Sequence, residues 1–317
     1  MFIQSVLPEA TWQAERRAHA ERVDGWLAQH RDRRSRAVEH PVEDFLFEYY
    51  NYRPYQLRRW HPGHGVVLAG KAAEELLGWR DYVRVDQGVT VDTAAVVSVR
   101  VKTIRWVYDL LSRTAQRPGY FGCFGLHEWA MVYRLAPDKV RHPDWPLRFS
   151  ADRVAAVVEE RGVRCGHFDA FRFFTPPARP LNALQPTRAS QPDLEQPGCL
   201  HANMDLYKHA YKLSPLVPSR LVGDTFALAR DIRELDMRAS PYDLSALGFE
   251  PVPIETAEGR AAYAQAQREF SVRSAPLRQA LIDVLGRVLA DTDEQRADDE
   301  QRANDERQAR AGALSGR

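Results

Sequence analysis

Histidines lie near acidic side chains at several places in this chain, at spacings that allow acid–base chemistry or metal binding. Mixtures of histidine, acid, cation and aromatic residue are typical of functional sites, because their charges and rings can act together on one ligand. Five segments are richest in such mixtures: residues 40–50, 58–61, 127–129, 167–172 and 201–208.

The last of these segments carries three polar side chains on one face of a predicted helix. His201, Asp205 and Lys208 are separated by four and three residues, so they can contact one another. Charged groups among apolar neighbours are costly to bury unless they are paired. We therefore expect either a functional site here or a simple ion pair between Asp205 and Lys208, with His201 as a satisfied cap.

The first segment has the same four-residue spacing between His40 and Asp44. The carboxylate of Asp44 could orient the imidazole of His40 and raise its basicity. The alternative interpretation is that Asp44 is only an acidic residue in the first turn of a helix, where it interacts favourably with the helix dipole.

The segment 163–174 is predicted to be a strand that places His167 and Asp169 on one face. A His-x-Asp pair on a strand occurs in non-haem iron sites, where a distant third histidine completes the ligand set. His127 or His201 could supply that histidine. His127 does not belong to a zinc-protease helix, because position 131 is methionine. Glu128 is predicted to lie off the apolar face of its helix.

Other common catalytic motifs do not occur in the sequence. There is no glycine-rich phosphate loop, no Gly-x-Ser-x-Gly elbow and no paired Cys-x-x-Cys. The cysteines Cys123, Cys165 and Cys199 are predicted to be small buried apolar residues. Their odd number and wide spacing fit a reducing compartment.

The elements that must position these residues are predicted to be mainly α, with about eight helices and a minor β element of two or three short strands. Capping residues and apolar periodicity favour helices over residues 9–36, 40–50, 93–117, 121–134, 152–161, 199–212, 218–237 and 258–288. Alternation favours strand structure over 82–91. The proline-rich segment 175–198 is predicted to be a loop.

The composition is that of a globular protein, with 317 residues, 44% hydrophobic and 27% charged. The 44 basic and 43 acidic residues nearly cancel, which gives no support for long-range attraction to nucleic acid. No apolar run approaches the roughly 18 residues that a membrane-spanning helix needs. We therefore expect no membrane partner and a cytoplasmic location.

Two regions differ sharply in composition. Residues 1–290 are predicted to form a single globular, mainly helical domain. Residues 291–317 contain the charged six-residue repeat DEQRAD, DEQRAN, DERQAR, which has almost no apolar residue to bury. We expect this tail to be a solvated helix or disordered.

Four long phrases in the chain resemble one bacterial family: HPVEDFLFEYYNYRP with QLRRWHPG directly after Tyr55, CFGLHEWAMVYR, RCGHFDAFRFF and EQPGCLHANMDLYKHAYKLSP. The family is found mainly in actinobacteria, and its members are usually labelled 3-methyladenine DNA glycosylase. The resemblance covers nearly the whole chain before the repeats. It implies an enzyme that removes alkylated purines from DNA by hydrolysing the N-glycosidic bond, without a cofactor. The chain lacks the helix-hairpin-helix and catalytic aspartate of the common alkyl-base glycosylases, and also the repeated helical pairs of the solenoid type.

A glycosylase must hold an extruded cationic base against aromatic rings, stabilise the sugar with a carboxylate and bind phosphates. For this activity we expect a base pocket made of Tyr49, Tyr50, Trp60, Trp129 and Tyr207. The expected catalytic residues are Asp205, Asp44 and His201, with Asp169 as a further candidate carboxylate. The expected phosphate contacts are Arg53, Arg58, Arg59 and Lys208.

The histidines that a glycosylase leaves unused support a competing hypothesis. It is a metal-dependent enzyme, of the non-haem iron or another His/Asp-ligated type, that acts on a small molecule. Its divalent metal would be bound by His127, His167, Asp169 and His201, or by Asp205 in place of Asp169. A third interpretation is a helical scaffold in which the polar segments form ion-pair networks.

Overall fold

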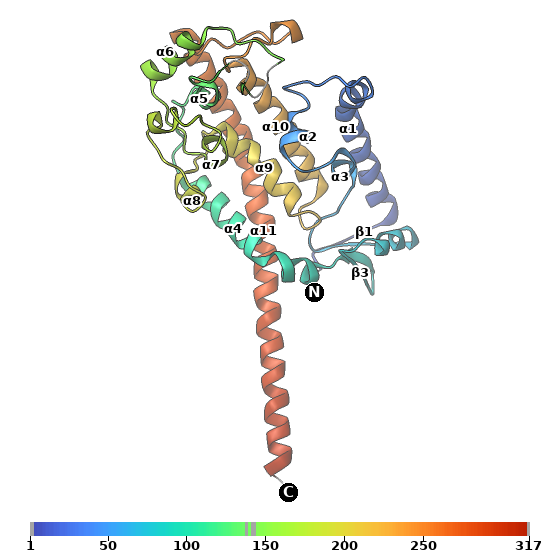
Figure 1. Ribbon diagram of the computed structural model, residues 1–317. Helices are drawn as coiled ribbons and strands as arrows, with labels where there is room; N and C mark the ends of the chain where they lie inside the picture. Colours follow the sequence, from blue (N-terminus) through green and yellow to red (C-terminus); the bar gives the residue numbers. More distant parts are fainter. Residues whose placement is uncertain (1–2, 137–138, 141–143, 316–317) are drawn as a thin grey trace.

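The computed structural model describes residues 3–136, 139–140 and 144–315. The predicted fold class is confirmed, because this part of the chain has eight helices of seven or more residues and one small sheet (Figure 1). The α-helices are α1 (Glu9–Ser35), α2 (Phe45–Tyr49), α3 (Pro54–Arg58), α4 (Thr93–Gln116), α5 (Leu126–Val132), α6 (Ala151–Arg161), α7 (Phe168–Phe171), α8 (Gln191–Leu194), α9 (Leu200–Lys212), α10 (Ser219–Arg238) and α11 (Ala257–Ser315). The 3-10 helices are η1 (Lys71–Gly78), η3 (Arg179–Leu181) and η4 (Ser245–Leu247).

The sheet has four short strands in the order β1-β2-β4-β3. The predicted strand region folds as a hairpin of β3 (Tyr82–Val85) and β4 (Gly88–Val91), with Val83 opposite Thr90. β1 (Ser5–Leu7) and β2 (Val66–Leu68) were not predicted, because three residues are too few to show alternation. β1 pairs with β2 in parallel, and β2 pairs with β4 in antiparallel orientation.

Helix α9 passes through the middle of the molecule, packed against α10 and α11 (Figure 1). All of its residues except the last are buried. A helix that is covered on all sides is normally apolar throughout. α9 instead buries a row of polar side chains: His201, Asn203, Asp205, Lys208 and His209.

The first part of helix α11 packs along the core, and its second part extends beyond the body of the molecule (Figure 1). It packs against α4, α9 and α10. Near the edge of the body, His64 Nε2 lies 2.8 Å from Asp291 Oδ2, and Arg105 pairs with Asp293 at 2.6 Å. The repeat segment forms the outer part of this helix. Within the described chain, no helix is both long enough and apolar enough to span a bilayer.

Two predicted elements differ from the structure. The strand expected over 163–174 is wrong: only Val163 forms an isolated bridge, and α7 follows. His167 caps α7, since its Nδ1 accepts a hydrogen bond from the backbone N–H of Ala170 at 3.2 Å. The helix expected over 121–134 is shorter, because Phe124 and Gly125 have left-handed backbone conformations with φ of 47° and 70°.

Candidate metal centre and the polar network of helix α9

Four ionisable side chains from three helices meet in the interior. His127 and Glu128 come from α5, His201 from α9 and Asp236 from α10. One candidate ligand atom from each lies within 4.8 Å of the other three, and all four residues are buried. These donors come from positions up to 109 residues apart, so the tertiary fold alone assembles them.

Local structure explains how adjacent residues of α5 both reach this cluster. All but one of the residues of this short helix are buried, so there is no solvent face to which Glu128 could turn. The left-handed Gly125 starts the helix in close contact with its neighbours, since a Cβ there would lie 3.3 Å from the Tyr263 ring. On α10, Asp236 follows Ile232 by four residues and therefore shares its buried face.

Asp236 is the most deeply buried member of the cluster, with 0% of its surface exposed. Its Oδ1 lies 2.8 Å from His127 Nε2. Its Oδ2 has no hydrogen-bond partner in the described chain. Its Oδ2 lies 3.7 Å from Arg233 Nη1 and 4.0 Å from His201 Nε2. One oxygen of a buried carboxylate thus faces the cluster without a donor.

The charges in the cluster follow from burial and from the carboxylates. Burial disfavours the charged form of His127, but the Asp236 carboxylate outweighs it and raises the pKa of His127. Burial, together with the neighbouring His127, lowers the pKa of His201 to about 3. Burial would raise the pKa of Asp236, but His127 opposes it and holds that pKa below its usual range. His201 is therefore neutral and Asp236 is ionised.

These four side chains fit a first-row divalent metal. Imidazole nitrogen and carboxylate oxygen are ligands of zinc, iron and manganese. Because such bonds are about 2.0–2.2 Å long, two ligands of one ion are at most about 4.4 Å apart. The observed limit of 4.8 Å therefore requires shifts of a few tenths of an ångström. The Asp236 oxygen without a donor is the second feature that suits a cation.

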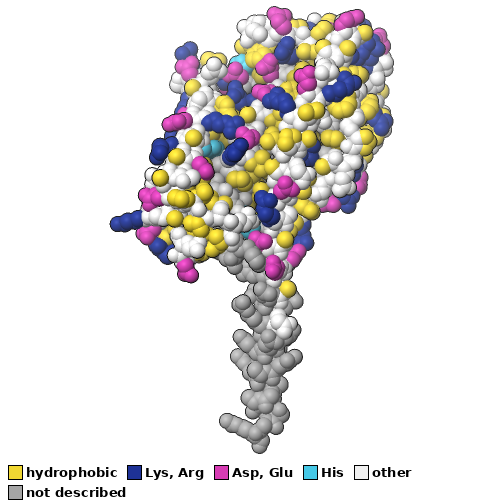
Figure 2. Space-filling model, turned by 180° about the vertical axis from the view of Figure 1, so that it is seen from behind, with side chains coloured by type: hydrophobic (Ala, Val, Ile, Leu, Met, Phe, Trp, Pro, Cys, Tyr) yellow, Lys and Arg dark blue, Asp and Glu magenta, His cyan; other side chains and the backbone are white. Residues whose placement is uncertain are grey.

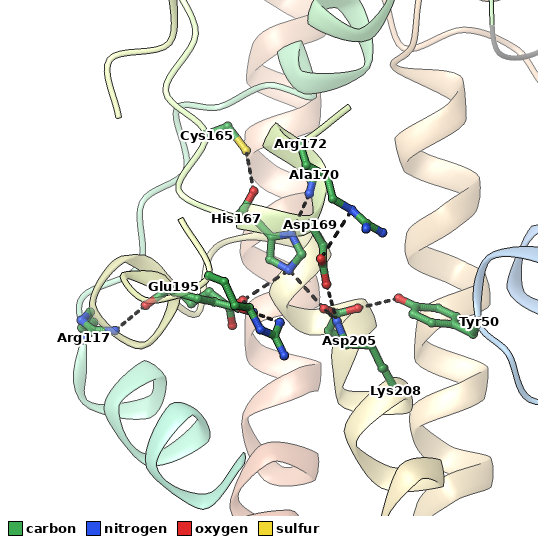
Figure 3. A network of polar contacts seen from close by, with 12 residues as sticks. Tyr50, Arg117, Cys165, His167, Asp169, Ala170, Arg172, Glu195, Asp205 and Lys208 are labelled. Carbon is green, nitrogen blue, oxygen red and sulfur yellow. Dashed lines mark hydrogen bonds and ion pairs between the residues drawn. The ribbon is translucent and has the colours of Figure 1, made fainter. Parts of the chain in front are cut away.

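A second group of polar residues surrounds His167 and Asp205 (Figure 3). His167 Nε2 lies 3.2 Å from Asp205 Oδ2 and 3.3 Å from Glu195 Oε1. Because His167 Nδ1 already accepts the backbone N–H of Ala170, the proton of the neutral ring is on Nε2. That proton points between the two carboxylates.

Asp205 is the centre of this second group. It accepts a hydrogen bond from the Tyr50 hydroxyl at 2.9 Å and contacts Lys208, whose Nζ also donates to Asp169 Oδ2 at 2.8 Å. Burial would raise the pKa of Asp205, but Lys208 and His167 hold it well below its usual range. Burial raises the pKa of Glu195. Asp205 is thus the ionised partner of His167, and Glu195 is the partner that more readily holds a proton.

His201 joins the two groups. Its ring lies edge-on to His127, with centroids 4.4 Å apart, and stacks on His167 at 5.3 Å. A continuous polar network therefore runs along α9 from the metal-type cluster to Lys208. A pocket of about 230 Å³ reaches this network, since His167 and Glu195 line it together with Arg117 and Arg164.

The base pocket expected for a glycosylase is assembled only in part. Tyr49, Tyr50 and Tyr207 gather beside Asp205, with Tyr50 4.9 Å from Tyr49 and 5.6 Å from Tyr207 between ring centroids. Tyr50 and Tyr207 are 2% and 0% exposed, so side chains cover the surfaces that a base would stack on. The two tryptophans lie in other packing environments: Trp60 stacks on Trp12, and Trp129 donates to the carbonyl of Ala239.

Asp44 belongs to a different network, and the hypothesis that it orients the His40 ring is wrong. Its carboxylate binds His30 Nδ1 at 2.8 Å and the guanidinium of Arg33. From His40 it accepts only the backbone N–H, at 3.1 Å. The His40 ring instead accepts the backbone N–H groups of residues 42 and 43.

The expected phosphate contacts do not share one environment. Arg53, Arg58 and Arg59 are exposed at α3, where Arg58 pairs with Asp24 and Arg59 lies over the Trp79 ring. Lys208 is buried between Asp169 and Asp205. On the face shown in Figure 2, basic and acidic side chains are interspersed rather than gathered in a basic patch.

The expected metal ligands are brought together in part. His127 and His201 meet, whereas His167 turns its Nε2 to carboxylates and Asp169 pairs with Lys208. Glu128 was predicted to lie off the apolar face of its helix, which is wrong, because it is buried in the cluster. Asp236 and Glu195 were not predicted as site residues. A signal existed for Asp236, which lies in register with the apolar stripe of its helix. Glu195 lies in a proline-rich segment, where no sequence pattern indicated a buried acidic residue.

Comparisons with known proteins add no family and no activity. No protein-family model, no curated protein and no solved structure matches the chain. The family resemblance and the glycosylase activity that it implies therefore stay predictions.

Proposed function

We propose that this protein is a metal-dependent enzyme that binds a divalent first-row metal and acts on a small molecule. The ligands are His127, Glu128, His201 and Asp236. The observation that carries the proposal is the meeting of these four buried donors from three helices within 4.8 Å. The proposal is supported by Asp236, whose Oδ2 accepts no hydrogen bond in the described chain and therefore has capacity for a ligand.

The balance of charge supports a cation in this region. Carboxylates outnumber the arginine and lysine side chains that contact them, so histidines, bound protons or a metal ion must supply the remaining positive charge. The carboxylates belong to Glu128, Asp169, Glu195, Asp205 and Asp236, and the basic partners are Arg172, Lys208 and Arg233. Arg233 lies 3.5 Å from Glu128 Oε1, so it neutralises part of the cluster.

Residues around the cluster suggest how the chain would take part in a reaction. A divalent metal bound here would supply Lewis-acid or redox chemistry. His167 holds a proton on Nε2 between Glu195 and Asp205 and lies at the pocket, so it can pass a proton between a ligand and the network. Arg117 and Arg164 line the pocket beside Asp193 and Glu195, so a ligand there would meet groups of both charges.

Metal analysis of the purified protein tests the proposal directly. We expect a single equivalent of iron, manganese or zinc per chain, lost in His201→Gln and in Asp236→Asn. His61→Gln is the matched control, because His61 is a buried histidine hydrogen-bonded to Tyr82 outside the cluster. Circular dichroism shows whether each variant folds. Folded wild-type protein that takes up none of these metals when they are supplied would overturn the proposal.

A second candidate function is the DNA glycosylase that the family resemblance implies. The observation that favours it is the group of Tyr49, Tyr50 and Tyr207 around the ionised Asp205. Release of 3-methyladenine from alkylated DNA would support this function over the metal-dependent enzyme if a chelator leaves the release unaffected. Asp205→Asn should abolish it. Activity that disappears on chelation and returns with metal would favour the metal-dependent enzyme.

A further inference from the structure

A second pocket, of about 350 Å³, opens on the opposite end of α9 from His201. It is formed between α4, α9 and the segment that precedes α8. Its charged lining is entirely basic, and no acidic residue is among the described residues that line it. The basic side chains are Lys102, Arg188, Lys208 and Lys212.

A buried histidine lines this pocket beside Trp106. His209 is 3% exposed and lines the pocket, yet its Nε2 has no hydrogen-bond partner in the described chain. A buried polar atom is normally satisfied, so an unsatisfied one at a pocket indicates a ligand or water. Burial and the nearby Lys208 lower the pKa of His209 to about 3, so the ring is neutral and can donate one hydrogen bond.

The basic side chains of the pocket are not neutralised equally. Lys208 already contacts Asp169 and Asp205. Arg188 is held in place, because its guanidinium lies over the Trp106 ring at 4.4 Å and donates to Gln191 Oε1 at 2.8 Å. Partial burial and the charge of Lys208 lower the pKa of Lys212, as expected for a cation among cations.

We propose that this pocket binds the phosphate group of a small phosphorylated ligand. Three basic groups, Lys102, Arg188 and Lys212, line one pocket together with His209, whose buried Nε2 has no hydrogen-bond partner in the described chain. Convergent cations with a neutral donor suit a multiply charged tetrahedral anion better than a single carboxylate. The concave shape, rather than a basic stripe, selects a small ligand over a nucleic-acid backbone. The proposal does not depend on the metal-dependent function.

Isothermal titration calorimetry with three probes tests this site: inorganic phosphate, pyrophosphate and adenosine monophosphate. The protein is used as purified and again after chelation, so that anion binding at a metal is recognised separately. We expect saturable binding of at least one probe that persists after chelation. Lys102→Gln and Lys212→Gln should each weaken it by about tenfold. Both lysines are exposed, so these variants should fold normally.

Two further variants sharpen the result. His209→Phe keeps an aromatic ring but removes the nitrogen, and it should also weaken binding. Lys71→Gln is the matched control, because Lys71 is an exposed lysine at η1 outside the pocket, and its loss should leave the affinity unchanged. The proposal is overturned if no probe binds at millimolar concentration, or if the three pocket variants all bind as tightly as the wild type. Binding of a single-stranded oligonucleotide without binding of any probe would also overturn it, in favour of a nucleic-acid surface.

Discussion

Asp44 and Asp236 are both buried aspartates that contact a histidine and lie near an arginine, but their environments differ in one respect. Both oxygens of Asp44 are fully used: Oδ1 binds His30 and Arg33, and Oδ2 binds Arg33 and the His40 backbone. Asp236 binds His127 through Oδ1, whereas Oδ2 accepts no hydrogen bond in the described chain.

This difference separates a structural ion pair from a candidate site. A buried carboxylate whose oxygens are all paired contributes to the native fold and has no capacity left for a ligand. A buried carboxylate with one unsatisfied oxygen among histidines retains that capacity. The residue types are the same in both places, so only the geometry distinguishes them.

The largest effect is expected at Asp44. Asp44→Ala leaves the buried His30 without its partner and leaves Arg33 paired with Glu43 alone, and we expect it to lower the free energy of unfolding by about 3 kcal/mol. Urea unfolding followed by circular dichroism measures this value. Asp24→Ala is the control, because Asp24 forms partly exposed ion pairs with Arg31 and Arg58 and should cost at most about 1 kcal/mol. Equal losses in the two variants would show that the Asp44 network is not a structural ion pair.

Metal should stabilise the protein through Asp236 and not through Asp44. At a free metal concentration of one hundred times Kd, we expect the free energy of unfolding to rise by about 2.7 kcal/mol. Asp236→Asn should lose this increase, because the neutral amide is a poorer metal ligand than the carboxylate. Asp44→Asn should retain the metal-induced increase, although its free energy of unfolding without metal is lower than that of the wild type. Unfolding with and without added metal measures both, and an equal increase in the Asp236 variant would remove Asp236 from the ligand set.

The pH dependence of stability gives the smallest and most specific test. Burial would raise the pKa of Asp44, but Arg33 and His30 outweigh it and lower that pKa below its ordinary value. The stabilisation is therefore complete above the ordinary pKa of about 3.9 and is lost as the pH falls through the folded value. We expect the difference in stability between wild type and Asp44→Asn to shrink as the pH falls below about 4. A difference that stays constant over this range would contradict the ion-pair assignment.

The fold was largely predictable, since its long helices depend on local signals. The helix expected over 93–117 is α4 (Thr93–Gln116), with Asp92 capping it by accepting the Ala95 N–H. Ser150 caps α6 in the same way, as expected. The error at 163–174 has a local cause. Aromatic residues there suggested a strand, whereas the ring of His167 starts a helical turn by accepting a backbone N–H.

The candidate site was predictable only in part, because its members come from distant segments. The sequence indicated that His127 and His201 carry chemistry, but not which carboxylates join them. Asp169 was favoured because a strand over 163–174 would have placed it on the same face as His167. In the structure α7 turns it towards Lys208. Asp236 and Glu128 reach the cluster through the packing of α5 and α10 around α9, which no local pattern encodes.

The outer part of α11 gives the chain a property that a disordered tail would lack. A continuous helix rises about 1.5 Å per residue, so the stretch beyond Asp293 reaches roughly 30–35 Å from the body. Because the inner part of the same helix is clamped in the core, that reach has a fixed direction. A pair of spin labels, one on the body and one near Ser315, should therefore give a narrow distance distribution, as expected for a rigid spacer.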